Sequence, residues 1–247
     1  MGDGARYRAF VLDHTVAASP EAVPELSLRL ATEVTPLWTA SAADLEDAEI
    51  EPPFWAFAWA GGVALARWVL DNPEVVRGRV VLDLGAGSGL VGIAAKRSGA
   101  ARVIASDVDP VALVACALNA EMNGVELERD GRDRLDDPSA GADVVLVGDL
   151  FYDASIGPRV LSALRRWTSL PSTTSGDVPE TLSPEKTVSG TSPEVVEAYV
   201  GDPGRGYLPG AADLVPLRAA ELPTSVDLES AVSKRVTVYR FSPRSSR

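Results

Sequence analysis

Residues Val80 to Gly89 constrain the fold of this chain more than any other stretch. They read Val-Val-Leu-Asp-Leu-Gly-Ala-Gly-Ser-Gly, in which apolar strand formers are followed by three glycines at alternating positions. A helical pattern follows over Leu90–Arg97. A strand, a glycine turn and a helix in this order point backbone N–H groups and a helix N-terminus at a nucleotide-like ligand. We therefore expect the first unit of a doubly wound α/β domain here.

The acid at the end of this strand, Asp83, discriminates between ligands. A carboxylate repels a pyrophosphate and attracts a cationic amino-acid tail. S-adenosylmethionine has such a tail, with an ammonium and a sulfonium. Gly87, Gly89 and Gly92 also spell G-x-G-x-x-G, which alone is a weak dinucleotide signal. Asp83 therefore favours S-adenosylmethionine as the cofactor, and the alternative is a Rossmann-like turn that has kept no ligand.

The composition narrows the class of protein. The 247 residues suit one domain with additions, and 46% of them are hydrophobic, enough for a full core. A net charge of −12 disfavours nucleic-acid partners and favours basic ones. The single cysteine, Cys116, rules out a disulfide and a cysteine-based metal cluster. We expect no metal site.

The composition also gives expectations about the source and location of the protein. No apolar run approaches the ~18 residues of a membrane helix. Residues Met1 to Phe10 are polar and lack the apolar region of a signal peptide, so we expect a cytoplasmic protein with no membrane partner. Three lysines stand against twenty arginines, and alanine is abundant, which indicates a GC-rich, bacterial genome.

Strand and helix signals alternate from Arg79 onward. This alternation predicts an α/β fold with a Rossmann-like, doubly wound seven-stranded sheet, mostly parallel with an antiparallel C-terminal strand. The strands are expected at Arg79–Asp83, Arg102–Ser106, Val125–Glu128, Asp143–Val147, 195–201, Leu214–Leu222 and Arg235–Phe241, and the helices at Val63–Leu70, Leu90–Arg97, 110–122 and 156–167.

Two segments lie outside this alternation. Residues 1–53 are expected to form an N-terminal arm, in which Leu26, Leu28 and Leu30 alternate with polar residues as in a strand. Residues 54–247 would form the cofactor-binding domain. Within it, residues 168–193 are rich in Ser, Thr, Pro and Gly and are predicted to be a disordered insertion.

Acids follow two of the expected strands. Asp107 comes 24 residues after Asp83 and could accept hydrogen bonds from ribose hydroxyls. Asp109 competes for this role, but its place before Pro110 suits a helix N-cap better. Asp107 is therefore the predicted ribose ligand.

The segment Gly148–Asp153, Gly-Asp-Leu-Phe-Tyr-Asp, follows the fourth strand and should face the transferred methyl group. Here Asp149 could orient a substrate ammonium and assist its deprotonation, and an aromatic face such as Tyr152 could stabilise a cationic centre. We predict Asp149 and Tyr152 as the catalytic residues. The alternative is a helix-capping acid followed by core aromatics.

Large aromatics also precede a pair of glycines in Phe54–Gly62, Phe-Trp-Ala-Phe-Ala-Trp-Ala-Gly-Gly. The paired glycines suggest the close approach of a ligand or of backbone. Trp59 could touch the cofactor or belong to the core. His14 is the only histidine and is expected to be structural or solvated, which leaves a serine hydrolase without a base.

These motifs together resemble the seven-β-strand class I methyltransferases, and in particular the electron transfer flavoprotein β-subunit lysine methyltransferase group and its bacterial relatives. The resemblance covers nearly all of the chain outside the insertion. The glycine motif identifies only the superfamily, whereas Trp-Ala-Gly-Gly and Asp-x-x-Tyr together are more specific. The matching stretches are Pro24–Leu30, Pro53–Gly62, Leu70–Gly78, the Asp83 glycine motif, Ser106–Pro110 and Gly148–Asp153.

The resemblance implies a role for each matching residue. The cofactor-binding loop would hold the methionine part of S-adenosylmethionine. Asp107 would bind the ribose, and Trp59 would pack beside the cofactor. Asp149 and Tyr152 match the Asp-x-x-Tyr motif that places the target lysine. The stretch 130–137 is hard to align, and Asp133 is the residue assigned to adenine. The loop residues are Asp83, Gly85, Gly87 and Gly89.

The expected function is that of a protein-lysine N-methyltransferase dependent on S-adenosylmethionine, with the electron transfer flavoprotein β-subunit as the substrate that the resemblance suggests. A small-molecule or ribosomal-protein N-methyltransferase on the same fold is the runner-up, since a fold does not determine a substrate. A non-catalytic cofactor-binding partner protein is the alternative from another class. The sequence predicts no oligomeric state.

Overall fold

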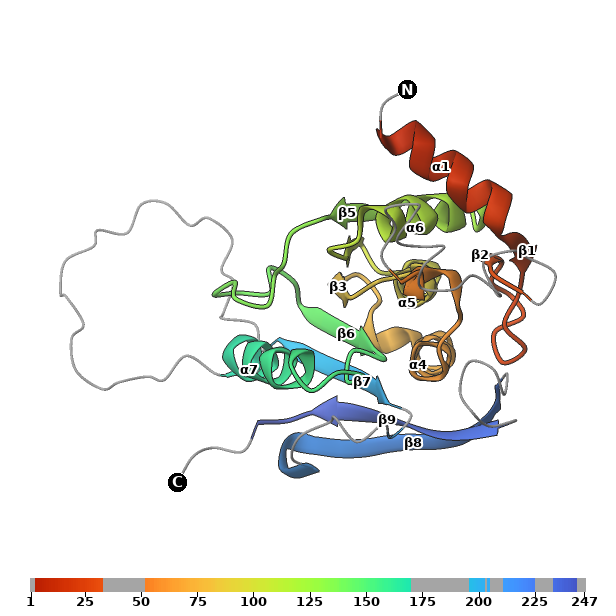
Figure 1. The fold of residues 1–247 in the computed structure, drawn as a ribbon. Coiled ribbons are helices and arrows are strands. Elements are labelled where there is room, and N and C mark those ends of the chain that lie inside the picture. The colour runs from red at the N-terminus through yellow and green to blue at the C-terminus, as the bar shows by residue number, and fades with distance from the viewer. Residues whose placement is uncertain are drawn as a thin grey trace, which may run out of the picture.

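A seven-stranded sheet forms the centre of the molecule (Figure 1). The computed structural model describes residues 3–32, 52–169, 196–202, 204, 211–224 and 233–243. The strands are β3 (Val80–Leu84), β4 (Arg102–Ser106), β5 (Glu128–Asp130), β6 (Val144–Gly148), β7 (Glu197–Asp202), β8 (Leu214–Pro223) and β9 (Ser233–Phe241).

The strand order is β5-β4-β3-β6-β7-β9-β8. Strands β3 to β7 pair in parallel, and β9 is antiparallel to both β7 and β8. The order reverses between β3 and β6, where the crossovers change direction along the sheet. This confirms the predicted fold class and places the ligand site at the carboxyl ends of β3, β4 and β6.

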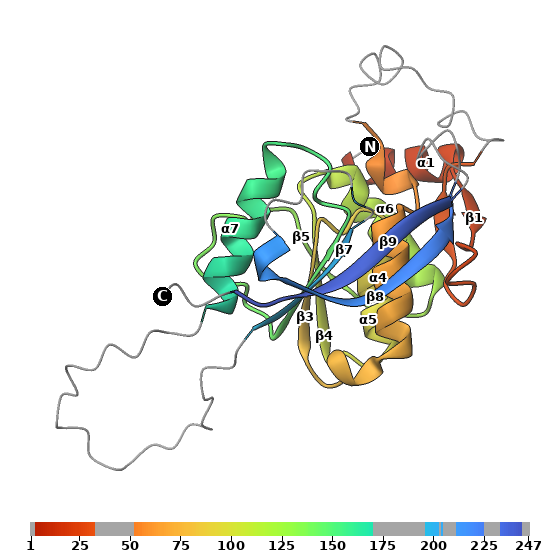
Figure 2. The same cartoon turned by 90° about the horizontal axis from the view of Figure 1, so that it is seen from below.

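Helices cover both faces of the sheet (Figures 1 and 2). Helices α4 (Ala60–Asp71), α5 (Leu90–Arg97) and α6 (Pro110–Met122) lie on one face, and α7 (Ile156–Thr168) lies on the other. Successive strand side chains point to opposite faces. Val144 of β6 therefore joins the core under α4 and α5, and Val145 joins the core under α7.

The N-terminal segment packs onto the same domain. It comprises α1 (Asp3–His14), β1 (Val16–Ala18) and β2 (Leu28–Leu30), with β1 antiparallel to β2. Helix α1 lies along α6 (Figure 1). Leu26 and Leu28 are fully buried in the core that also contains α4. Leu28 and Leu30 thus lie in the expected strand, whereas Leu26 precedes it, and the boundary at residue 53 stays a prediction.

Two amides on α6 hold this segment in place. Asn119 Oδ1 accepts the Arg29 N–H at 2.6 Å, and Asn119 Nδ2 donates to the Ser88 carbonyl at 2.8 Å. One turn later, Asn123 Oδ1 accepts the Ser27 N–H at 3.1 Å. Asn119 is fully buried, and its two hydrogen bonds link the N-terminal segment directly to the glycine loop.

Some elements differ from the sequence prediction. The third strand was expected at Val125–Glu128, which is wrong, because β5 begins only at Glu128. Val125 and Leu127 instead pack their side chains against the core. Helix α1 was not predicted, because its apolar residues do not form a pronounced stripe. The rest of the expected insertion, residues 170–193, lies outside the described residues.

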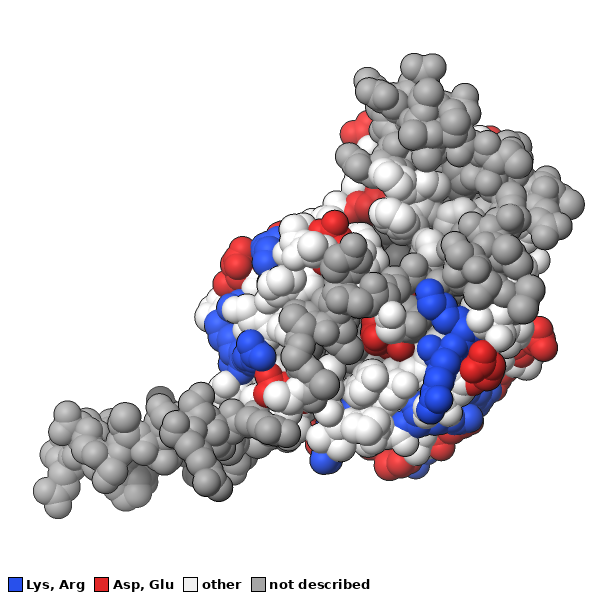
Figure 3. Space-filling model, turned by 60° about the horizontal axis from the view of Figure 1, so that its bottom comes forward, with Lys and Arg blue, Asp and Glu red and all other residues white. Residues whose placement is uncertain are grey.

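Short 3-10 turns complete the fold: η1 (Phe54–Ala56), η2 (Pro73–Val75) and η3 (Ala211–Asp213). On the face drawn in Figure 3, basic and acidic side chains lie next to one another rather than in a patch of one sign. Arg67 and Arg218 both form ion pairs with Asp71. None of the helices in the described ranges is long and apolar enough to cross a membrane.

Candidate active site

The loop after β3 adopts a conformation that requires glycine. Gly85, Gly87 and Gly89 have φ angles of +67°, +51° and +79°, in the left-handed region that other residues avoid. The N–H groups of Gly85 and Ala86 donate to the Ser106 carbonyl at 2.8 and 3.0 Å, which ties the loop to the end of β4. Among the described residues, a Cβ on Gly87 would meet only the Trp55 Cα within 4 Å, which leaves room for close approach to this backbone.

Asp107 lies directly beside this loop. Its Oδ2 accepts the Gly87 N–H at 2.8 Å and its Oδ1 accepts the Asp109 N–H at 3.0 Å. Burial raises the pKa of Asp107, and these backbone hydrogen bonds oppose the rise. Asp109 caps α6 by accepting the Val111 N–H at 2.7 Å. The sequence therefore assigned Asp109 correctly as the cap, and Asp107 keeps acceptor capacity for a ribose because each carboxylate oxygen has two lone pairs.

Asp83 lies beneath the loop rather than on its surface. Its side chain is 2% exposed, and its Oδ2 accepts the Gly92 N–H of α5 at 2.8 Å. Burial raises the pKa of Asp83 to about 7, partly offset by the Gly92 hydrogen bond. A Cβ on Gly92 would come within 2.9 Å of the Asp83 carboxylate, so the third glycine of G-x-G-x-x-G permits this contact. Contact of Asp83 with a cofactor ammonium stays a prediction.

Asp149 occupies a strained position at the end of β6. Its φ angle of +55° makes it the non-glycine residue with positive φ in the described part of the chain. Its N–H donates to the Gly201 carbonyl at 3.1 Å, and its Oδ2 accepts the Gly62 N–H at 2.7 Å. Helix α4 gets no side-chain hydrogen bond from its own N-cap residue, Trp59, so Asp149 caps α4 from another part of the chain.

Four glycines allow this approach. A Cβ on Gly61 would lie 2.4 Å from the Gly201 carbonyl and 2.6 Å from Asp149 Oδ2, and a Cβ on Gly148 would lie 2.9 Å from the Gly62 Cα. The paired glycines of Trp-Ala-Gly-Gly thus permit close approach of backbone and of a carboxylate, as the sequence suggested. Sequence reasoning missed Gly148 and Gly201, whose only signal is a glycine at the end of each of two neighbouring strands.

Aromatic rings border the same place. Tyr152 is 38% exposed, and its ring centroid lies 5.4 Å from that of Phe54, which is 50% exposed. Trp59 lies 6.1 Å from Phe54, and its Nε1 donates to the Phe54 carbonyl at 2.7 Å. Burial raises the pKa of Tyr152, and the charges of Asp107 and Asp153 add to the rise. Whether Trp59 touches the cofactor stays a prediction.

The predicted site residues therefore converge, with one exception. A Cβ on Gly85 would strike the Leu150 side chain, so the loops after β3 and β6 are in contact. Asp133 instead bonds to the Leu135 N–H and to Arg159 of α7, at 3.0 and 2.9 Å. These contacts join it to its own loop and to α7, and its assignment to adenine stays a prediction.

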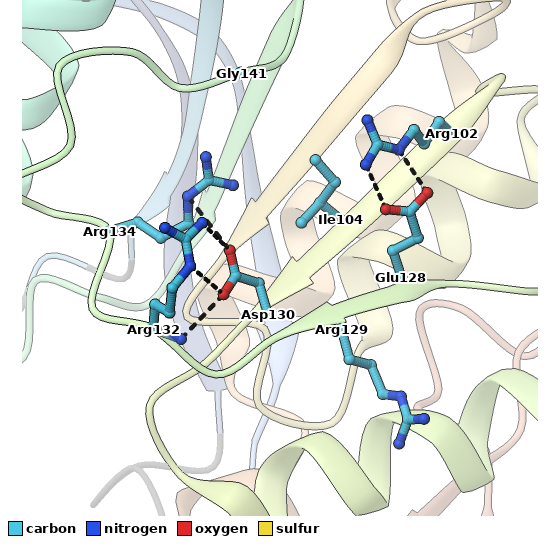
Figure 4. Close-up of a pocket in the computed structure, with 8 residues that line it drawn as sticks. All are labelled: Arg102, Ile104, Glu128, Arg129, Asp130, Arg132, Arg134 and Gly141. Carbon is cyan, nitrogen blue, oxygen red and sulfur yellow. Dashed lines mark hydrogen bonds and ion pairs between the residues drawn. The ribbon is translucent and has the colours of Figure 1, made fainter.

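A separate pocket of about 370 Å³ lies at the edge of the sheet (Figure 4). Three of its four arginines are paired with acids: Arg102 with Glu128, and Arg132 and Arg134 with Asp130. Arg129 points away from these residues, towards a helix. None of the predicted site residues lines this pocket.

His14 and possible metal ligands are the remaining candidates. His14 Nδ1 bonds to the Phe10 carbonyl at 2.9 Å, and the two rings stack at 4.2 Å, which is a structural role. Among the residues described, no three His, Cys, Asp or Glu side chains gather as they would around a metal ion.

The site fits S-adenosylmethionine. The three left-handed glycines bring backbone N–H groups and the N-terminus of α5 to the carboxyl end of β3, and Asp107 offers carboxylate oxygens at the end of β4. Asp83, Gly85, Gly87 and Gly89 remain the residues predicted for the methionine part, and Asp107 the one predicted for ribose.

Comparisons with known proteins agree with this assignment. The model of the family "Ribosomal protein L11 methyltransferase (PrmA)" matches residues 67–148. The electron transfer flavoprotein beta subunit lysine methyltransferase of Danio rerio is 34% identical over 94% of this chain and 82% of its own length. That of Xenopus laevis is 35% identical over 96% and 87%. The crystal structure of Trm5b from Pyrococcus abyssi superposes with a TM-score of 0.51 at 12% identity, over 92% of this chain and 56% of that one, which concerns the fold alone.

The sheet order, the glycine loop and these relatives define an S-adenosylmethionine-dependent methyltransferase of the seven-strand class. The alternative of a non-catalytic binding protein is thereby set aside. Within that class, the chain belongs to the family of electron transfer flavoprotein β-subunit lysine methyltransferases.

Proposed function

We propose that this protein transfers methyl groups to lysine side chains of the electron transfer flavoprotein β-subunit, with Asp149 and Tyr152 as catalytic residues. The observation that supports this most directly is the Asp149–Tyr152 loop, which contacts the glycine loop and is lined by exposed aromatic rings. The substrate is suggested by the names of the relatives that match nearly the whole chain.

The chemistry required of the protein is limited. When bound, S-adenosylmethionine supplies the methyl group in activated form on its sulfonium. A lysine amine has an unperturbed pKa near 10.4 and must lose its proton before it attacks. Asp149 would hold the substrate nitrogen in place and accept that proton. Its negative charge favours the protonated lysine, so its benefit lies in orientation and proton acceptance.

The fixed orientation of Asp149 supports this role. The hydrogen bond from Gly62 and the left-handed backbone together hold the carboxylate in one direction. A group held in a productive geometry contributes to rate without the entropic cost of ordering it in each turnover. Tyr152 would line the path of the lysine with its ring.

A ribosomal-protein methyltransferase is the second candidate. The observation that favours it is the match of residues 67–148 to the ribosomal protein L11 methyltransferase model. These residues include the glycine loop and Asp107, and they end just before Asp149. The match therefore concerns the cofactor half of the domain and supports cofactor binding more than the choice of substrate. A small-molecule substrate has no observation of its own in favour.

The test compares two substrates in separate reactions. The purified protein is incubated with methyl-labelled S-adenosylmethionine and with either the purified electron transfer flavoprotein β-subunit or ribosomal protein L11. The proposal expects label on the flavoprotein subunit, in lysine, and much less on the ribosomal protein. The reverse preference would establish the second candidate in its place. Label on neither protein, with cofactor binding intact, would contradict both.

A bacterial source and a cytoplasmic location stay predictions from the composition. The two full-length relatives described above come from a fish and a frog and support neither. Binding of nucleic acid or of a membrane is not expected, and no contact bears on the oligomeric state.

A further inference from the structure

Two of the exposed side chains need an explanation beyond the fold. Among the described residues, Phe54 and Tyr152 are the aromatic side chains that stay largely exposed, at 50% and 38%. They come from segments almost a hundred residues apart, yet their ring centroids lie 5.4 Å apart at an interplanar angle of 43°. Trp59 extends the group, 6.1 Å from Phe54. We call Phe54, Trp59 and Tyr152 the aromatic wall.

Hydrogen bonds and a buried neighbour anchor the backbone that carries the aromatic wall. The Phe54 carbonyl accepts the indole N–H of Trp59 at 2.7 Å, and the Phe54 N–H donates to the Pro52 carbonyl at 2.7 Å. The next residue, Trp55, is 1% exposed and lies in the core that α6 shares. The exposed Phe54 ring therefore stands on a buried support and is presented to solvent in a fixed position.

The aromatic wall lies next to the groups assigned to catalysis. Trp59 is the N-cap residue of α4, and three residues later Gly62 donates to the Asp149 carboxylate. Tyr152 follows Asp149 in the same loop. The charges of Asp107 and Asp153 act on the Tyr152 hydroxyl, so negative charge is within electrostatic reach of the rings. Aromatic faces beside carboxylates suit a ligand that is apolar along its length and cationic at its end.

We propose that Phe54 is a specificity-determining residue that binds the side chain of the substrate lysine against the aromatic wall. This inference rests on the proposed function. The four methylenes of lysine would lie along the Phe54 and Tyr152 rings, and the charged nitrogen would reach Asp149. A neutral side chain of the same length would make the apolar contacts and lose the attraction of the ring faces and the carboxylate for a cation. Phe54 thereby contributes to substrate affinity and not to the chemical step.

The kinetic test uses the electron transfer flavoprotein β-subunit as substrate. Phe54→Ala should raise KM for this protein about five- to thirtyfold, since the contacts of the ring with the lysine methylenes and with the nearby cation together contribute about 1–2 kcal/mol. The value of kcat and the affinity for S-adenosylmethionine should stay within about twofold of wild type. Phe54→Tyr should keep KM near the wild-type value because it keeps the ring, and Phe54→Leu should have a KM between those of Phe54→Tyr and Phe54→Ala. Leu217→Ala, which truncates a 41% exposed side chain on β8, is the matched control.

A binding measurement separates this inference from the proposed function. The probe is N-acetyl-lysine methylamide, observed by saturation-transfer NMR on the protein loaded with S-adenosylhomocysteine, with the norleucine analogue as the uncharged reference. Wild type should bind the lysine probe better than the reference, and Phe54→Ala should lose this preference. If wild type leaves the flavoprotein subunit unmethylated but shows this preference, the proposed substrate is wrong, and the inference that the aromatic wall binds a lysine side chain is retained. An unchanged KM and an unchanged preference in Phe54→Ala would overturn the inference.

Discussion

The carboxylate of Asp149 caps helix α4 by accepting the N–H of Gly62 at 2.7 Å. The two residues come from different segments, and the glycines at 61, 62, 148 and 201 allow them to meet. The sequence offered two interpretations of Asp149, a helix cap or a catalytic acid. The cap serves a neighbouring helix and uses one carboxylate oxygen, Oδ2, so the two interpretations are compatible.

This relationship makes Asp149→Asn the most informative substitution. Asparagine tolerates the left-handed backbone and keeps an oxygen that can accept from Gly62, so the fold should be retained. It loses the charge and the ability to take a proton. Turnover should fall about 10²–10⁴-fold, with cofactor affinity unchanged in calorimetry. Asp149→Ala should in addition lose the cap and lower the free energy of unfolding by about 1 kcal/mol. Near-wild-type turnover in Asp149→Asn would reduce Asp149 to a structural residue.

Asp107 should contribute to cofactor affinity in two ways. It is the predicted acceptor for ribose, and it already holds the Gly87 N–H at 2.8 Å. Asp107→Ala should weaken S-adenosylmethionine binding about 10- to 150-fold, the effect of losing one charge-assisted hydrogen bond. Asp109→Ser, which keeps an N-cap for α6, is the control and should bind almost normally. Equal losses of affinity in both variants would mean that the loop conformation, and not a ribose contact, is responsible.

Asp83 should make the stability of the ligand-free protein depend on pH. Its pKa is about 7 in the folded protein and about 3.9 in an unfolded chain. Between these values the folded state holds a proton that the unfolded state has lost, so the free energy of unfolding falls as the pH rises. Asp83→Asn cannot titrate. From about pH 4 to about pH 8, its stability relative to wild type should therefore rise, by on the order of 4 kcal/mol. Parallel pH profiles in urea denaturation would contradict this.

The same residue gives a test of its predicted contact with the cofactor ammonium. A cation near the carboxylate favours the charged form, so binding of S-adenosylmethionine should lower the pKa of Asp83 and release part of a proton near pH 7. Calorimetry in two buffers of different ionisation enthalpy measures this release. Wild type should release more protons than Asp83→Asn. Equal release in the two proteins would place the ammonium away from Asp83.

Asn119 should couple the N-terminal segment to the glycine loop. Asn119→Ala leaves the Arg29 N–H and the Ser88 carbonyl without their partner, which should lower the free energy of unfolding by about 1–3 kcal/mol. It should also weaken cofactor binding, because Ser88 lies within the loop. Glu121→Ala on the same helix removes only an exposed ion pair with Arg8 and serves as the control. A destabilised Asn119→Ala with unchanged cofactor affinity would limit Asn119 to a structural role.

The elements that could be predicted from the sequence are those with a strong local pattern. Residues 80–84, 102–106 and 110–122 lie within one residue of their expected bounds, because apolar strands, a glycine turn and an Asp-Pro cap each leave a clear local signal. Helix α1 was not predicted, and strand β5 was predicted too early in the chain. Both depend on packing against α6 and β4, which no short-range pattern encodes.

The site was predictable as a set of residues but not as a geometry. The side chains that follow parallel strands converge because the strand ends share one edge of the sheet. The burial of Asp83 behind its loop and the use of Asp149 as a cap for α4 depend on contacts between segments distant in the sequence. Phe54 was noted only as one of several aromatics, since exposure cannot be deduced from a hydrophobic stretch.

Lysine methylation that depends on Asp149 can be tested by mass spectrometry. The electron transfer flavoprotein β-subunit is incubated with S-adenosylmethionine and either the wild-type protein or Asp149→Asn, and its peptides are then mapped. We expect methyl groups on lysine side chains with wild type, and almost none in the same time with the variant, although both proteins bind the cofactor equally. Equal methylation by the two proteins, or methyl groups confined to residues other than lysine, would contradict this expectation.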